Sequence, residues 1–115
     1  MTMKVNPGRY PVVTLCGSTK FKDEFIRAQE ELTLQGNVVI TVGLFGHADN
    51  KFGDIITDQV KEMLDQIHIE KIDMCDYIYV INKDDYIGES TRKEINYAKY
   101  CGKRVVYMFE HNELK

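Results

Sequence analysis

The residues best suited to chemistry lie in the segment GESTRKE, which ends at Glu94 and opens an expected helix. Gly88 lets a ligand approach the backbone, and Ser90 or Thr91 can cap the helix. Ser90 and Glu94 are one residue too far apart for the S/T-x-x-E capping pattern, so Glu94 need not be used in capping. The positive end of the helix is then expected to keep this carboxylate ionised, as a nucleophile requires. An ordinary surface glutamate is the alternative interpretation.

A second candidate segment, Gly17-Ser18-Thr19-Lys20, lies between an expected strand and an expected helix. Free backbone N–H groups and the positive helix end at such a junction can hold an anion such as phosphate, and Ser18 and Thr19 add hydroxyl donors. The alternative is that Ser18 or Thr19 only caps the helix. With one glycine the segment matches neither a Walker A loop nor a GxGxxG fingerprint.

No metal site or cofactor site is predicted. His47 lies in the glycine-rich segment 43–53, an expected mobile loop, where it could contact a ligand, whereas His68 and His111 have no companion at ligand spacing. The cysteines are odd in number, widely spaced and set beside apolar stretches, which favours reduced thiols in the core: Cys16, Cys75 and Cys101. Cys16, next to the first loop, could instead line a site.

The elements that must position these residues alternate along the chain. Short β-branched or apolar runs predict strands at residues 11–16, 38–42, 77–81 and 104–109. Segments with apolar residues at helical spacing separate them, the second with Ile56, Val60, Met63, Leu64 and Ile67 on one face.

This order predicts an α/β fold, a three-layer Rossmann-like or flavodoxin-like domain with a four- to five-stranded parallel sheet. We expect one domain over residues 1–115. Ligands of such sheets bind outside the carboxyl ends of the strands, where the segments that contain Ser18, His47 and Glu94 converge.

Composition restricts the partners. The 115 residues carry a net charge of −3 without a basic stripe, so a nucleic acid polymer is not expected to bind. The longest apolar runs are too short to span a bilayer, and the start of the chain lacks the apolar core of a signal peptide. We therefore expect a cytoplasmic protein with no membrane partner.

Four segments resemble the nucleoside 2-deoxyribosyltransferase superfamily, which includes the 2′-deoxynucleoside 5′-monophosphate N-glycosidases. They are VVTLCGST, GNVVITVGLFGHAD, KIDMCDYIYVI and GESTRKEINYAKYCGKRVVY, and the resemblance covers nearly all of residues 12–109. It implies that Glu94 of EINYA attacks the sugar carbon C1′, and that a second base or water resolves the glycosyl-enzyme.

The resemblance also implies roles for other positions. Gly17 and Ser18 match the first loop, and Asp76 matches a catalytic-site aspartate at a strand start. Gly88, Ser90 and Thr91 match the small residues that hold a 5′-phosphate in the glycosidase branch. A homodimer or larger homo-oligomer is implied as well, and the apolar second helix is a candidate interface.

The leading hypothesis is therefore cleavage of the N-glycosidic bond of a nucleoside or nucleotide, by hydrolysis or by transfer to another base. A catalytically inactive protein that senses or sequesters a nucleotide is the alternative. It is motivated by Thr14 and Gly88, where the transferases carry a tyrosine and an aspartate. A flavodoxin-like redox module has little support, because neither a CxxC pair nor an aromatic flavin site is evident.

Overall fold

In the computed structural model, which describes residues 8–45 and 53–111, four strands form one parallel sheet. The strands are β1 (Val12–Gly17), β2 (Val38–Ile40), β3 (Tyr77–Ile81) and β4 (Arg104–Tyr107), and their order across the sheet is β2-β1-β3-β4. The predicted α/β class and strand number are confirmed. Because the chain moves outward from β1 in both directions, the order reverses between β1 and β3, and this reversal marks the usual ligand crevice of such sheets.

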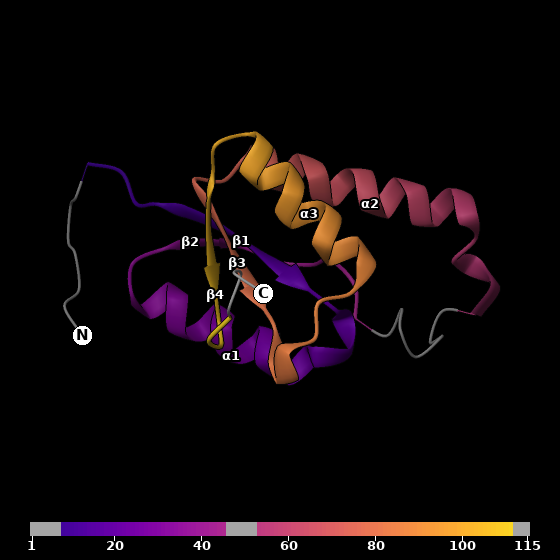
Figure 1. The fold of residues 1–115 in the computed structure, drawn as a ribbon, viewed down its shortest axis with the longest axis horizontal. Coiled ribbons are helices and arrows are strands. Elements are labelled where there is room, and N and C mark those ends of the chain that lie inside the picture. The colour runs from indigo at the N-terminus through magenta and orange to yellow at the C-terminus, as the bar shows by residue number, and fades with distance from the viewer. Residues whose placement is uncertain (1–7, 46–52, 112–115) are drawn as a thin grey trace.

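Three α-helices connect the strands, as Figure 1 shows: α1 (Lys22–Leu34), α2 (Asp58–Asp73) and α3 (Glu89–Tyr100). Short 3₁₀ turns precede each of them: η1 (Thr19–Phe21), η2 (Gly53–Ile55) and η3 (Lys83–Asp85). None of the helices in the described ranges is long and apolar enough to cross a membrane.

The sheet has a hydrophobic layer on each face. Alternate residues of β1 point to opposite sides, so Leu15 packs with Phe25 and Leu32 of α1, while Cys16 packs with the layer that holds α2 and α3. Figure 1 shows α1 below the sheet and α2 and α3 above it. The predicted three-layer arrangement is therefore present.

The second strand is shorter than predicted. Residues 38–42 were expected to be extended, but β2 ends at Ile40, the last residue paired with β1. β2 is at the edge of the sheet and pairs only with β1, and this pairing ends at Thr14 and Ile40 although β1 continues to Gly17. Val42 instead begins the segment that runs along the cleft described below.

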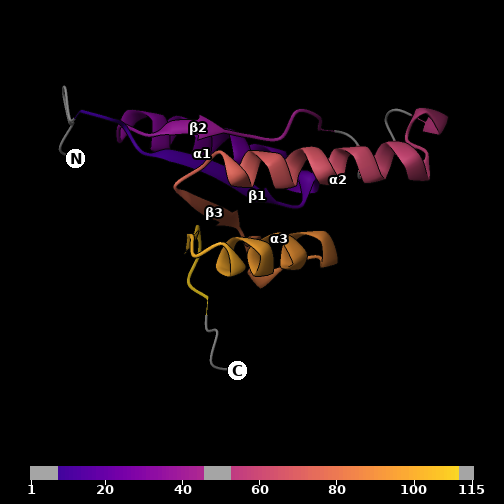
Figure 2. The same ribbon diagram turned by 90° about the horizontal axis from the view of Figure 1, so that it is seen from above.

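Helix α2 differs most from expectation. Its carboxyl-terminal part packs on the sheet through His68 and Ile72, whereas its first half extends past the sheet (Figures 1 and 2). The apolar face predicted there stays largely uncovered, with Met63 51% and Ile67 41% exposed. Lys103 holds the other end of the helix, because its Nζ donates to the carbonyls of Ile72, Asp73 and Cys75.

Candidate active site

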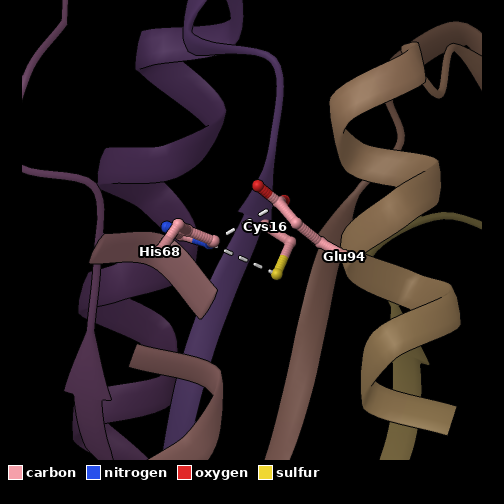
Figure 3. Close-up of side chains that lie close together, drawn as sticks. All are labelled: Cys16, His68 and Glu94. Carbon is pink, nitrogen blue, oxygen red and sulfur yellow. Dashed lines mark hydrogen bonds and ion pairs between the residues drawn. The ribbon is translucent and has the colours of Figure 1, made fainter. Parts of the chain in front are cut away.

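Three side chains from distant parts of the chain converge above the carboxyl end of β1 (Figure 3). Cys16 comes from β1, His68 from α2 and Glu94 from α3. His68 Nε2 lies 3.5 Å from Cys16 Sγ and 3.8 Å from Glu94 Oε1. The side chains of His68 and Glu94 are only 10% and 15% exposed. The two therefore interact in surroundings with little water.

Burial controls the protonation of Glu94. It raises the pKa of this carboxyl to about 7, and the nearby negative charge of Asp65 adds to the effect. A hydrogen bond with Cys16 and the charge of Lys61 act in the opposite direction. With a pKa of about 7, Glu94 is only partly ionised at neutral pH, less than the expectation from the helix end implied. Helix α3 begins at Glu89, so Glu94 lies in its second turn, beyond the range of the helix-end charge.

His68 and Cys16 are both uncharged at neutral pH. Burial, helped by the charge of Lys71, lowers the pKa of His68 to about 4, and burial raises the pKa of the Cys16 thiol well above its ordinary value. Cys16 and Glu94 approach the same nitrogen of His68. In a nucleophilic triad the acid and the nucleophile bind opposite ring nitrogens, so these residues do not form a thiol protease-like relay.

A cleft of about 950 Å³ opens above these side chains, within the size range of small-molecule sites. Its walls come from the first loop, the segment after β2, the exposed face of α2 and the start of α3. The predicted site residues that line it are Gly17, Ser18, Thr19, Gly88, Ser90, Thr91 and Glu94. The structure thus brings together seven of the nine residues singled out for catalysis or binding.

The first loop has a fixed path. Gly17 has φ +151°, and a Cβ atom there would lie 2.9 Å from the carbonyl oxygen of Ile81, so only glycine fits without a shift. Ser18 is the residue before η1, and its side-chain oxygen accepts a hydrogen bond from the Lys20 N–H. The capping alternative therefore applies to Ser18, although the residue also lines the cleft.

Asp76 does not lie in the cleft. Its Oδ2 accepts a hydrogen bond from the N–H of Val12, the first residue of β1, and its Oδ1 pairs with Arg9 at 2.5 Å. It is therefore at the amino end of the sheet, whereas Gly17 and Glu94 are at the carboxyl end. The predicted catalytic role of Asp76 is incompatible with this position, since the carboxylate holds the entry into β1 instead.

The remaining expectations concern His47 and the three cysteines. His47 falls in residues 46–52, outside the described residues, so its predicted ligand contact has no structural counterpart here. Cys16 and Cys75 are buried free thiols as predicted, but Cys101 is exposed. It follows the last residue of α3 as its C-cap and points away from the core.

Sequence reasoning missed the role of His68. It lies four residues after Leu64 and eight after Val60, so the helical repeat places it on the inward face of α2. A histidine on an otherwise apolar inward face is a signal of a polar site. Its partners are 52 and 26 residues away, however, and no local spacing could have shown that they meet. Lys61, Lys71 and Lys93 also line the cleft and were not anticipated.

The architecture defines an α/β protein with one parallel sheet between two helical layers. The structure is similar to that of a 2-deoxyribosyltransferase from the psychrotolerant bacterium Bacillus psychrosaccharolyticus, with a TM-score of 0.64 and 17% identity over 88% of this chain and 77% of the other. The chain belongs to the family described as "Domain of unknown function (DUF4406)", whose model matches residues 12–107. No curated protein matches the chain.

Proposed function

We propose that the protein cleaves the N-glycosidic bond of a nucleoside or nucleoside 5′-monophosphate, with Glu94 as the nucleophile. The observation that carries the proposal is a largely buried carboxylate at a cleft of about 950 Å³, located where the strand order reverses. The similarity in fold to a 2-deoxyribosyltransferase supports the same chemistry.

The reaction proceeds in two displacements. The ionised Glu94 carboxylate bonds to C1′ as the C–N bond breaks, and the base leaves with the bonding electrons and takes up a proton. Water, or the nitrogen of a second base, then attacks C1′ and releases the carboxylate. Both steps pass through an oxocarbenium-like state whose positive charge the carboxylate stabilises. No cofactor takes part.

The lining of the cleft suits a nucleoside. Apolar side chains from two elements form one wall, where a base can be buried: Val42, Leu44, Met63, Leu64 and Ile67. The start of α3 forms the opposite wall, and Gly88 at its N-cap position makes no side-chain capping bond. Backbone N–H groups of the first turn are thus available to a 5′-phosphate, and Lys93, which pairs with Glu89, adds a positive charge beside them. We infer a preference for the monophosphate, and for hydrolysis over transfer.

His68 and Cys16 act as positioning residues. They contact the Glu94 side chain from the floor of the site but carry no charge that would neutralise it at neutral pH. A cation such as arginine in the place of His68 would stabilise the carboxylate in the ground state and weaken it as a nucleophile. The neutral surroundings therefore favour attack once Glu94 has lost its proton.

The test is base release from a panel of 2′-deoxynucleosides, ribonucleosides and their 5′-monophosphates, with and without an acceptor base. Wild type is compared with Glu94→Ala and with Glu30→Ala, which removes an exposed glutamate of α1 far from the cleft. We expect release by wild type and Glu30→Ala and none by Glu94→Ala. Dependence on the acceptor base would assign transfer rather than hydrolysis.

Binding measured on the same panel separates the alternatives. A nucleotide that binds wild type and Glu94→Ala equally, without base release by either, would replace the enzyme with a nucleotide-binding protein. Release that persists in Glu94→Ala would show that another group is the nucleophile.

A further inference from the structure

The cluster of Cys16, His68 and Glu94 has the composition of a metal site, and it shares Glu94 with the proposed glycosidic chemistry. Among the described residues, one ligand atom of each side chain lies within 4.8 Å of the other two. We propose that these three side chains form a Zn²⁺ site, with a fourth coordination position directed toward the cleft.

The two separations that involve His68 Nε2 are close to those of tetrahedral coordination. Zinc bonds of about 2.3 Å to sulfur and about 2.0–2.1 Å to nitrogen, at a tetrahedral angle, place the two ligand atoms about 3.5 Å apart. Cys16 Sγ and His68 Nε2 are 3.5 Å apart. The corresponding nitrogen–oxygen separation is about 3.4 Å, and His68 Nε2 lies 3.8 Å from Glu94 Oε1. A small rotation of the Glu94 side chain would bring its Oε1 from 3.8 Å to the tetrahedral separation.

His68 Nε2 faces both Cys16 Sγ and Glu94 Oε1. This is the arrangement expected of three ligands around one metal ion. A hydrogen bond with the backbone of Leu15 also involves His68. Such a bond fixes the tautomer and orients the ring of metal-binding histidines. His68 Nε2 thus faces the two other ligand atoms, on the side where the ion would lie.

Charge and ligand type select the ion. A thiolate and an ionised carboxylate together carry −2, so they neutralise a divalent cation in surroundings where the Cys16 side chain is fully buried. Binding releases the thiol proton of Cys16 and the proton of Glu94 to solvent. Sulfur and imidazole ligands favour zinc over magnesium or calcium, which prefer oxygen alone.

Three protein ligands and an open position resemble catalytic rather than structural zinc sites. His68 and Glu94 line the cleft, whereas Cys16 lies beneath them, so the ion has a path from solvent and its fourth ligand is a cleft water. Because the ion uses the carboxylate of Glu94, zinc and a glycosyl group at Glu94 exclude one another. Zinc is accordingly an inhibitor if the proposed function holds.

The test measures the metal directly, so it does not depend on activity. The full chain is stripped with a chelator, and its affinity for added Zn²⁺ is measured by competition with a chromophoric chelator. We expect one ion per chain in wild type and in Cys101→Ala, which removes the exposed cysteine. Cys16→Ala is expected to lower the affinity at least about 100-fold, since loss of a supporting hydrogen bond alone costs 10–100-fold.

Two further measurements test the zinc site in case Cys16→Ala loses zinc only because it fails to fold. Glu94→Gln keeps the shape of the side chain and is expected to weaken zinc binding to a similar degree. Added Co²⁺ is expected to give a thiolate-to-metal charge-transfer band in wild type and Cys101→Ala, and none in Cys16→Ala. Weak binding by wild type, or equal binding by wild type and both site variants, would overturn the zinc site. Base release without zinc binding would leave the proposed function intact.

Discussion

Asp76 and Glu94 occupy opposite ends of the same parallel sheet, and their surroundings give them opposite properties. Asp76 is exposed and pairs with Arg9, and the hydrogen bonds from Arg9 and from the Val12 backbone lower the pKa of its carboxyl. Glu94 is largely buried beside the neutral His68, and burial raises the pKa of its carboxyl to about 7. A carboxylate paired directly with a cation supports the fold, whereas a largely buried carboxyl with a raised pKa is suited to chemistry.

The largest expected effect is on the rate of base release. Replacing each carboxylate with its amide removes the charge and keeps the shape. Glu94→Gln is expected to lower kcat at least about 1,000-fold because the nucleophile is lost, and Asp76→Asn less than about 10-fold because its contacts lie at the other end of the sheet. Steady-state assays of both variants provide the comparison. A similar loss of kcat in both variants would contradict the assignment of the catalytic carboxylate to the carboxyl end of the sheet alone.

The second effect is on stability, where the two amides have opposite signs. The pKa of Glu94 is about 7 in the folded protein against an ordinary 4.5, so the folded state holds more protons between these values and stability falls as pH rises through them. Glu94→Gln avoids this loss and is expected to be more stable than wild type by about 3 kcal/mol at about pH 8, with no difference near pH 4.

Asp76 has the opposite dependence. Its lowered pKa means that its contribution to stability is present above the ordinary value of 3.8 and is lost as pH falls through the folded-state pKa. Asp76→Asn is therefore expected to be less stable than wild type at neutral pH. Urea unfolding of both variants at a series of pH values measures these differences. Destabilisation by Glu94→Gln at about pH 8 would contradict the buried-carboxyl interpretation.

The third effect concerns self-association, which we expect at the carboxyl end of the sheet. Met63 in the projecting half of α2 is 51% exposed, and Met74 at the other end of the same helix is 68% exposed. We expect Met63→Lys to weaken dimerisation at least about 10-fold, since it places a charge in an apolar contact, and Met74→Lys to leave it unchanged. Sedimentation equilibrium measures both. A monomeric wild type would refute the interface.

The smallest effect is on the pH dependence of catalysis. Base release, measured with a chelator present, is expected to rise with pH to a plateau above about 7, where Glu94 is ionised. Asp65 raises the pKa of Glu94 and Lys61 lowers it, so Asp65→Asn is expected to move the midpoint to lower pH and Lys61→Met to higher pH. Both side chains are about half exposed, so each shift should be below about one unit. Shifts in the reverse directions would count against Glu94 as the titrating group.

The sequence was sufficient to predict the fold because each element carries its own local pattern. The runs around Val13, Val39, Ile78 and Val105 are short, apolar and separated by helical spacing, and all four became parallel strands. Boundaries were less accurate at the sheet edge, since the end of β2 depends on where β1 can pair with it. Such pairing is a property of two segments and is absent from either alone.

The candidate site was only partly predictable. The small residues could be chosen because they lie between strands and helices, and Glu94 because EINYA resembles the motif of a known superfamily. The charge state of Glu94 could not be predicted, because it depends on burial in the folded protein, which raises the pKa of its carboxyl. Asp76 was misassigned for a related reason, since a resemblance in sequence placed it in the site while its own strand places it at the opposite end.

Cys16, His68 and Glu94 have a consequence for folding. Cys16 and His68 are separated by 52 residues, and they meet only after two strands and two helices have assembled. Contacts so distant along the chain form late, because their loop-closure entropy must be offset first. The complete cluster therefore exists only in the folded chain, and a partly folded chain lacks this binding site. Binding therefore stabilises the folded state by RT ln(1 + L/Kd), where L is the concentration of free ligand, and the unfolding temperature is expected to rise with that concentration.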